Sequence, residues 1–451
     1  MLPTSKSPSP PPLDGEIRFD HRARAAAADD FGHLVRRIPE GVLLPASEED
    51  VAATVRWAAG RDLKFAAQGR RHSVFGRAQA HDGIVADLRR LRTIQDVQRD
   101  RVVVDAGATW REVLAATLPR GLAPPVLPDY LNLSVGGTLV VGGVGSRTRG
   151  FGVVSDHVLE LRVVTGRGEI LTCSPDRHRR LFDAVRAGLG QVAVITGATL
   201  RLVPAPRQVR RFLLSYRDLP TMLADQRLLT REDRFEAVQG AALGAPTGGW
   251  MFRLDAVKEL AGDPPDDAAL LAGLSDDRAR AEPSTLPLLD YLDRLAGLEQ
   301  LLRSNGQWRF PHPWLTTFVG DAMVESVVCG ELARLTPADL GPLGQILVSP
   351  ILRDSVTSPL FRLPPDAVCS TFNLMRFPPT DDAVDTRRLV AANRAVYERV
   401  RDAGGTLYPV SAFPMSRADW RAHLGAAFGP LSEAKREHDP GHVLTPGYEV
   451  F

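Results

Sequence analysis

Five glycines lie within ten residues of this chain, and no other feature of the sequence restricts its fold as strongly. They are Gly136, Gly137, Gly142, Gly143 and Gly145. Such density indicates a backbone that turns sharply or passes close to a ligand, because glycine tolerates both. A second glycine-bearing loop, 68–76, precedes this cluster. Loops of this kind can aim several backbone N–H groups at one anion, although they also occur as simple turns.

The segments around these two loops alternate between strand-like and helix-like patterns. Ser47 followed by Asp50 is typical of a helix start, and Gly60 of a helix end. The residues 165–168 read as the turn of a hairpin. Apolar periodicity predicts strands at 42–44, 63–67, 102–105 and 192–203, helices at 47–60, 109–117 and 181–187, and hairpin strands at 158–164 and 169–173.

The chain has 451 residues, which is too long for one ordinary core and predicts two domains. Pro204 and Pro206 mark the expected boundary, and the Ser/Pro-rich residues 1–16 are expected to form a disordered tail. The second half is expected to contain helices at 219–229, 286–302 and 386–403, an exposed excursion at 262–281, and a last helix after Ser416.

The composition excludes several classes of protein. Hydrophobic residues make up 44% and charged residues 24%, which is typical of a folded globular chain. The net charge of +1 predicts neither nucleic acid nor an anionic membrane as a partner. Three separated cysteines fit a reducing compartment. No apolar run approaches the ~18 residues of a membrane span. We therefore expect a cytoplasmic protein.

Several common catalytic motifs are absent. The sequence has no GxGxxG after a strand, no phosphate-binding P-loop, no HExxH and no GxSxG. Its ten histidines are scattered, so no metal site is expected. These absences argue against a Rossmann dehydrogenase, a P-loop NTPase, a zinc protease and a classical serine hydrolase.

Six segments together are more specific. They are GRRHS at 69–73, LPDYLNLSVGGTL at 127–139, LELRVVTGRGEILTCSPD at 159–176, LFDAVRAGLGQVAVITGATLRLVPAP at 181–206, PHPWL at 311–315 and HDPGHVLTPG at 438–447. In this order they resemble the cytokinin dehydrogenases, FAD-linked oxidases of the vanillyl-alcohol oxidase superfamily. The resemblance implies an α+β, two-domain PCMH-type FAD-binding fold with a cytokinin dehydrogenase-like substrate-binding cap domain. The FAD domain would be 17–205, the cap 206–407, and 408–451 would return to the FAD domain.

The resemblance also implies a cofactor and its attachment. In the family, the histidine of the first motif is joined covalently to the flavin 8α carbon, which here is His72; the alternative is an ordinary loop histidine. No cysteine lies between 129 and 145, so we expect a single attachment. The implied FAD contacts are Gly69, Arg70, Arg71, His72, Ser73, Gly76, Asp129, Ser134, Gly136, Gly137, Thr138, Val144, Ile195 and Tyr448.

Asp129 matches the family's catalytic aspartate, which would accept a proton from the substrate. Alternatively, it caps a turn after Pro128. Trp314 matches a tryptophan that sandwiches planar substrates, and its alternative is a buried anchor of the cap. The expected substrate-binding residues are Asp129, Gln239, Trp314, Thr316 and Tyr408.

Four positions depart from the family pattern. Arg71 stands where the family has glycine, Gln239 where it has glutamate, Thr316 where it has asparagine and Tyr448 where it has glutamine. Gln239 therefore lacks a charge and a proton acceptor, and Thr316 lacks a two-point amide contact. The residues expected to bind FAD match the family pattern more closely than the residues expected to bind the substrate.

The leading hypothesis is an oxidase or dehydrogenase that takes a hydride from a small planar or amine-bearing substrate to flavin N5. Oxygen or another acceptor would reoxidise the flavin, and the role could be a tailoring oxidation in secondary metabolism. The enzyme would act as a monomer or homodimer. One alternative is a non-redox flavoprotein of the same fold, such as a cyclisation catalyst. A sugar or alcohol oxidase is the other alternative, which Trp314 disfavours. A non-enzymatic binding protein would leave His72 and Asp129 without purpose.

Overall fold

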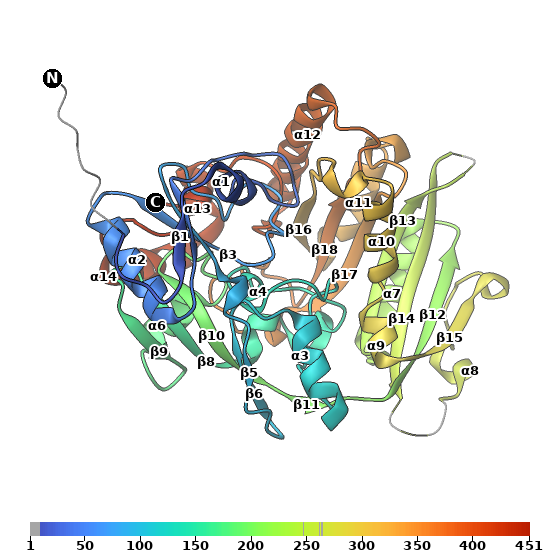
Figure 1. Cartoon of the computed structure of the whole chain (residues 1–451). Coiled ribbons are helices and arrows are strands. Elements are labelled where there is room, and N and C mark those ends of the chain that lie inside the picture. Colours follow the sequence, from blue (N-terminus) through green and yellow to red (C-terminus); the bar gives the residue numbers. More distant parts are fainter. Residues whose placement is uncertain (1–9, 247, 261, 263–264) are drawn as a thin grey trace.

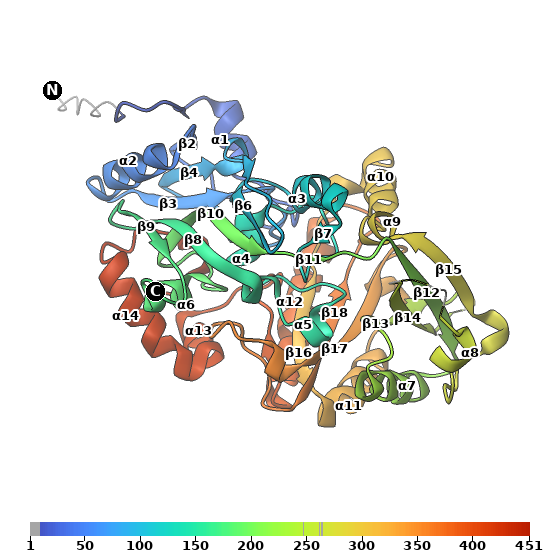
Figure 2. The same ribbon diagram turned by 90° about the horizontal axis from the view of Figure 1, so that it is seen from below.

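The computed structural model describes residues 10–246, 248–260, 262 and 265–451. Two smaller sheets and the helices around them occupy one side of the molecule, and one large sheet occupies the other (Figure 1). The view from below shows the C-terminal helices packed beside the smaller sheets rather than beside the large one (Figure 2). The chain therefore returns, at its end, to the half from which it started.

The two smaller sheets use strands from the first half of the chain. The first has the order β1 (Glu16–Arg18), β2 (Gly41–Leu44), β4 (Gly83–Asp87) and β3 (Lys64–Gln68), with the last three parallel. The second is antiparallel, in the order β5 (Ile94–Gln95), β6 (Arg101–Asp105), β10 (Ala193–Arg201), β8 (Val158–Thr165) and β9 (Ile170–Cys173). A short pair, β7 (Leu122–Ala123) and β11 (Val203–Pro204), lies beside them.

The large sheet is antiparallel and has eight strands. Their order is β15 (Glu282–Pro287), β12 (Gln208–Tyr216), β14 (Trp250–Leu260), β13 (Ala237–Gly244), β17 (Gln345–Leu352), β18 (Val368–Met375), β16 (Leu315–Gly320) and β19 (Thr406–Leu407). All its strands come from 208–407. The domain boundaries at 205 and 407 remain our proposal, which this change of sheet supports.

Helices fill the connections. In the first half these are α1 (His21–Ala27), α2 (Glu48–Ala59), α3 (Trp110–Thr117), α4 (Val135–Leu139), α5 (Thr148–Phe151) and α6 (Arg179–Val185). Beside the large sheet are α7 (Leu219–Glu232), α8 (Asp267–Leu270), α9 (Leu288–Leu292), α10 (Ala296–Ser304), α11 (Asp321–Leu332) and α12 (Ala383–Asp402). The chain ends with α13 (Arg417–Leu424) and α14 (Phe428–His438). Ser47 caps α2, as its sequence pattern predicts. The helix predicted to start at Thr109 is α3, and the structure shows a capping box there.

Three predicted boundaries are wrong. The helix predicted at 286–302 begins only at Leu288, because Leu286 belongs to β15. It is also two helices, since 293–295 form a break in which ion pairs with distant residues outweigh helix propensity. The helix predicted at 181–187 ends at Val185, since Ala187 has a positive φ of 54°. In the predicted tail, residues 1–9 lie outside the described part. The predicted tail includes Asp14 and Gly15, but their N–H groups donate to the Asp50 carboxylate.

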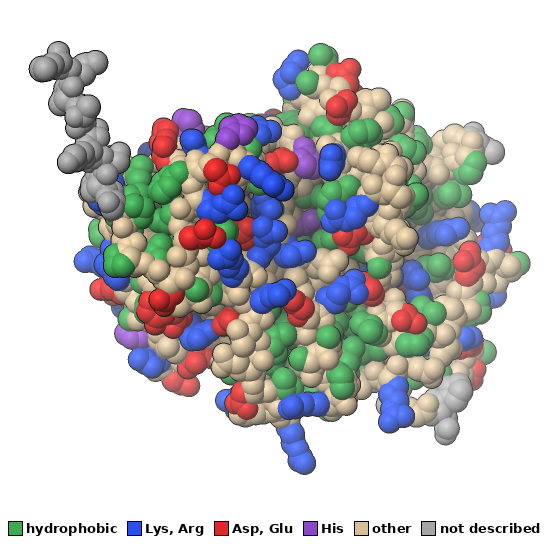
Figure 3. Space-filling view, viewed as in Figure 1, with side chains coloured by type: hydrophobic (Ala, Val, Ile, Leu, Met, Phe, Trp, Pro, Cys, Tyr) green, Lys and Arg blue, Asp and Glu red, His purple; other side chains and the backbone are tan. Residues whose placement is uncertain are grey.

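The predicted excursion at 262–281 includes 263–264, which lie outside the described residues; α8 lies within the remainder. Among the described residues, no helix combines the length and the apolar character that crossing a bilayer requires. On the face shown in Figure 3, basic and acidic side chains are interspersed rather than segregated.

Candidate active site

A cavity of about 400 Å³ lies between the small-sheet half of the molecule and the large sheet. We call its small-sheet side the glycine wall, which comprises the 69–73 loop, Ser134, Gly136, Gly137, Thr138, Gly143, Val144, Gly190, Ile195 and Tyr448. We call its opposite side the apolar wall, which comprises Leu295, Leu298, Leu302, Trp308, Trp314, Leu347, Met375 and Phe377. The glycine wall thus exposes backbone at its glycines, and the apolar wall offers apolar side chains.

The glycine wall depends on close approach of its segments. A Cβ on Gly69 would lie 1.9 Å from the Ser134 Oγ, so only glycine lets the 69–73 loop touch the start of α4. Gly143 has a φ of 79°, and its Cβ would lie 2.4 Å from the Thr138 side chain. The closely spaced backbone at these glycines fits a dinucleotide such as FAD, whose pyrophosphate is bound by backbone N–H groups.

His72 lines the cavity from the 69–73 loop. Its ring stacks on Phe31, with centroids 4.1 Å apart, and lies 4.7 Å from the Tyr130 ring. Burial lowers the pKa of His72 to about 3, so the imidazole is neutral at neutral pH. Neither ring nitrogen has a hydrogen-bond partner within the part of the chain that the structure describes. A neutral ring with free nitrogens can act as a nucleophile.

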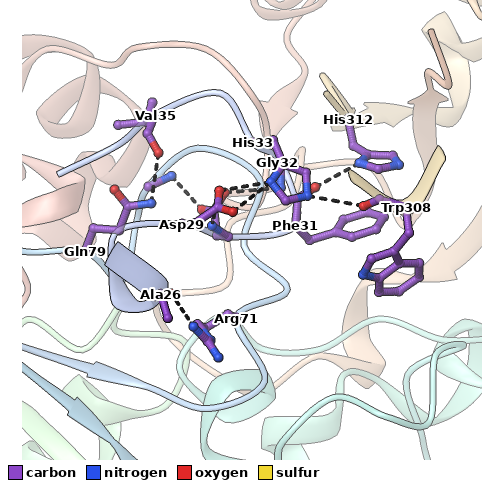
Figure 4. Close-up of polar contacts among 12 residues, drawn as sticks. Ala26, Asp29, Phe31, Gly32, His33, Val35, Arg71, Gln79, Trp308 and His312 are labelled. Atoms are coloured by element: carbon purple, nitrogen blue, oxygen red, sulfur yellow. Dashed lines mark hydrogen bonds and ion pairs between the residues drawn. The ribbon is translucent and has the colours of Figure 1, made fainter. Parts of the chain in front are cut away.

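Arg71, which replaces a family glycine, adopts the left-handed conformation with a φ of 56°. The backbone here therefore still has the shape that favours glycine, at a cost of roughly 1 kcal/mol for a residue with a Cβ. Its guanidinium donates to the Ala26 carbonyl at the end of α1 (Figure 4). This contact directs the head group towards the N-terminal segment, although other atoms of Arg71 line the cavity.

Asp129 faces the cavity and is held from two sides. Its Oδ1 accepts from the Arg294 guanidinium at 2.7 Å and from the Ser146 N–H at 3.1 Å. The Asp129 side chain is 29% exposed, and the Arg294 side chain is 14% exposed. Burial lowers the pKa of Arg294, but the Asp129 charge and hydrogen bond, together with Tyr291 and Asp255, outweigh burial, and the pKa is raised. Within the described residues no hydrogen bond reaches Asp129 Oδ2, so this oxygen can accept one from a ligand.

Arg294 was not predicted as a site residue. It lies in the break between α9 and α10, which the sequence pattern presented as continuous helix. Two carboxamides on the large sheet, Gln345 and Asn373, were also missed, and with Gln239 they line the cavity. Strand alternation could have placed Gln345 beside Leu347 on one face of β17. The Asn373 Oδ1 is buried and has no partner among the described residues.

The structure gathers most of the predicted site residues at this one cavity. Two lie elsewhere: Gly76 donates its N–H to the Asp30 carboxylate at 2.7 Å, and Thr316 pairs through its backbone with Ser411. The predicted residues that line the cavity are Gly69, Arg70, Arg71, His72, Ser73, Asp129, Ser134, Gly136, Gly137, Thr138, Val144, Ile195, Gln239, Trp314, Tyr408 and Tyr448.

Three residues predicted to contact substrate are each fixed by a hydrogen bond. The Trp314 indole N–H donates to the Arg376 carbonyl at 3.0 Å, and Gln239 donates to the Ser349 Oγ at 3.2 Å. The Tyr408 hydroxyl accepts from the Gly143 N–H at 3.2 Å, which ties Tyr408 to the glycine wall. Trp314 and Gln239 thus have fixed orientations at the cavity surface.

Comparison with known proteins agrees with this geometry. Residues 39–174 match the FAD binding domain family, and residues 268–451 match the family described as cytokinin dehydrogenase 1, FAD and cytokinin binding. An uncharacterized oxidoreductase, ORF5 in the fasciation locus of Rhodococcoides fascians, is 39% identical over 97% of this chain and 99% of its own length. Cytokinin dehydrogenase 10 of Oryza sativa subsp. japonica is 34% identical over 97% of this chain and 88% of its own.

A solved structure shows the same fold. The 6-hydroxy-D-nicotine oxidase of Arthrobacter nicotinovorans superposes with a TM-score of 0.73 at 21% identity, covering 98% of each chain.

Proposed function

This chain belongs to the cytokinin dehydrogenase family of FAD-linked oxidoreductases, and on that premise we propose that it oxidises a carbon beside the nitrogen of a planar amine. The substrate would lie between the glycine wall and the apolar wall, with its amine towards Asp129. The observation that carries this proposal is the free Asp129 Oδ2 at a cavity surface that is otherwise mostly apolar.

Asp129 is proposed as the proton acceptor. Oxidation removes a hydride from carbon and a proton from nitrogen, and bound FAD supplies the acceptor for the hydride. Arg294 and the Ser146 N–H fix Oδ1, which leaves Oδ2 to orient the substrate N–H and to receive its proton. The ion pair stabilises the negative charge of Asp129 before the proton arrives.

The apolar wall suits a flat substrate. Trp308, Trp314 and Phe377 offer ring faces and edges, while the carboxamides of Gln239, Gln345 and Asn373 offer hydrogen bonds without charge. This combination favours an uncharged heteroaromatic amine over a sugar, which needs hydroxyl-binding groups along its whole edge. We propose that His72 binds the flavin covalently, that oxygen or another acceptor reoxidises it, and that the physiological reaction is a cytokinin oxidation or a secondary-metabolite tailoring step.

Anaerobic flavin bleaching tests the proposed function. The probes are an N6-alkylated adenine, a benzylic secondary amine, an aliphatic alcohol and a hexose. We expect an amine to bleach the flavin, and Asp129→Asn to retain flavin while slowing the bleaching by about 100-fold, the contribution typical of a positioned base. Colour that persists with every probe during turnover would favour the non-redox alternative, and bleaching by the alcohol or hexose alone would favour the other oxidase class.

A further inference from the structure

Residues 29–33, between α1 and β2, are hydrogen-bonded to the loop that carries His72. The Phe31 N–H donates to the Arg71 carbonyl at 2.9 Å, and the Gly32 N–H donates to the Ser73 carbonyl at 3.1 Å. These two bonds flank His72 on either side. The 29–33 segment lies before residue 39, where the match to the FAD-binding domain begins. The segment is thus joined to the 69–73 loop by backbone hydrogen bonds on both sides of His72.

The same segment is bonded to the large-sheet half of the molecule (Figure 4). The His312 N–H donates to the Gly32 carbonyl at 3.0 Å, and the His312 Nδ1 donates to the Phe31 carbonyl at 2.8 Å. His33 contacts the Asp29 carboxylate through Nδ1 at 2.9 Å and the Trp308 carbonyl through Nε2 at 3.2 Å. The 29–33 segment thus fixes the cap residues 308–312 relative to the 69–73 loop.

Three rings stack in a row across this junction, and a fourth contacts them at a tilt. Phe31 lies between His312, at 3.9 Å and 16°, and His72, at 4.1 Å and 23°. The Tyr130 ring lies 4.7 Å from the His72 ring and is tilted by 32° to it. The order is therefore Tyr130, His72, Phe31, His312. Because His72 has no hydrogen bond within the described residues, ring contacts are what define its orientation.

We propose that Phe31 is a positioning residue for flavin attachment: its ring, backed by His312, holds the His72 imidazole in the orientation in which a ring nitrogen meets the flavin 8α carbon. This inference rests on the proposed covalent link. Attachment forms one C–N bond and breaks one C–H bond of the 8α methyl group and one imidazole N–H bond. The two protons and two electrons released pass to dioxygen, which becomes hydrogen peroxide.

The test measures acid-stable flavin, not activity. Wild type, His72→Ala, Phe31→Leu and Phe31→Tyr are incubated with FAD in air, and the flavin in the acid-precipitated pellet is followed over time against total bound flavin. Leucine has a similar volume without a ring, whereas tyrosine keeps the ring. We expect Phe31→Leu to bind FAD but to attach it about tenfold more slowly, the factor that one aromatic pair can supply. Phe31→Tyr should attach flavin at the wild-type rate.

Each outcome is decisive. Attachment in Phe31→Leu at the wild-type rate overturns the role of Phe31 but leaves the link intact. A colourless wild-type pellet overturns the covalent link itself, and a coloured His72→Ala pellet places the link on another residue. If Phe31→Leu does not fold, His312→Asn replaces it. Asparagine can still donate to the Phe31 carbonyl but removes the ring behind Phe31, so slower attachment supports the inference and unchanged attachment overturns it.

Discussion

Replacing Arg294 with glutamine tests the contact by which the two halves of the molecule hold Asp129, the proposed proton acceptor. The Arg294–Asp129 contact of 2.7 Å corresponds to a gross attraction of about 6 kcal/mol at an effective dielectric constant of about 20. Desolvation offsets much of this. Exposed ion pairs contribute less than about 1 kcal/mol, whereas disrupting a buried pair costs about 3–5 kcal/mol. Because Asp129 is 29% exposed, the energy of the Arg294–Asp129 pair falls between these two values. We expect Arg294→Gln to lower the free energy of unfolding by about 2 kcal/mol.

The same substitution should change chemistry as well as stability. Without Arg294, Asp129 loses the cation that fixes Oδ1 and stabilises its charge. Flavin reduction by the N6-alkylated adenine or the benzylic amine should slow by about 10- to 100-fold, part of what a positioned base supplies. Urea unfolding and anaerobic stopped-flow measurements of flavin reduction check the two effects.

The chain offers a matched control. Arg111 in α3 pairs with Asp293, the residue before Arg294, and so joins the same two halves without lining the cavity. Arg111→Gln should cost about 1 kcal/mol of stability, because this pair is more exposed, and should leave the reduction rate unchanged. Reduction by Arg294→Gln at the wild-type rate would refute the reasoning.

Two further predictions concern stability. Lys435→Met should cost about 3–5 kcal/mol, measured by urea unfolding, because it leaves the fully buried Asp439 carboxylate without its cation. A double variant with Asp439→Asn should recover part of the loss, since the charge is removed but the asparagine NH2 faces a backbone N–H, and no recovery would contradict this cause. Burial lowers the pKa of His312 to about 4 in the folded chain, against an ordinary value of 6.5. The neutral His312 ring therefore contributes to the free energy of unfolding above about pH 6.5, and this contribution is lost as the pH falls towards 4. When the pH is lowered from 7 to 5, the free energy of unfolding of His312→Asn should therefore fall by about 2 kcal/mol less than that of the wild type, as measured by urea unfolding. Equal falls in the two proteins would show that His312 does not titrate in this way.

Local signals were enough to predict most of the fold. The Ser47 cap, the helix start at Thr109 and the hairpin turn at 165–168 each depend on residues a few positions apart. The resemblance in six motifs predicted the α+β, two-domain PCMH-type fold and the FAD-linked oxidoreductase class, and the comparisons confirm both. The individual site roles remain predictions.

The site residues that were not predicted depend on contacts with residues that are distant in sequence. Arg294 meets Asp129 across 165 residues, and His312 meets Phe31 across 281. No local pattern distinguishes such an arginine from a solvated helix residue, or such a phenylalanine from ordinary core. The helical periodicity of the sequence also gave no indication of the break at 293–295, because the ion pairs that favour the break form only in the folded chain.

The most direct test of the account is the visible absorption spectrum of the freshly isolated protein. An FAD held in the cavity between the glycine wall and the apolar wall predicts a yellow protein with stoichiometric flavin, whose colour is lost when an amine probe is added without air. A folded protein that is colourless and does not bind added FAD would contradict the account at its centre.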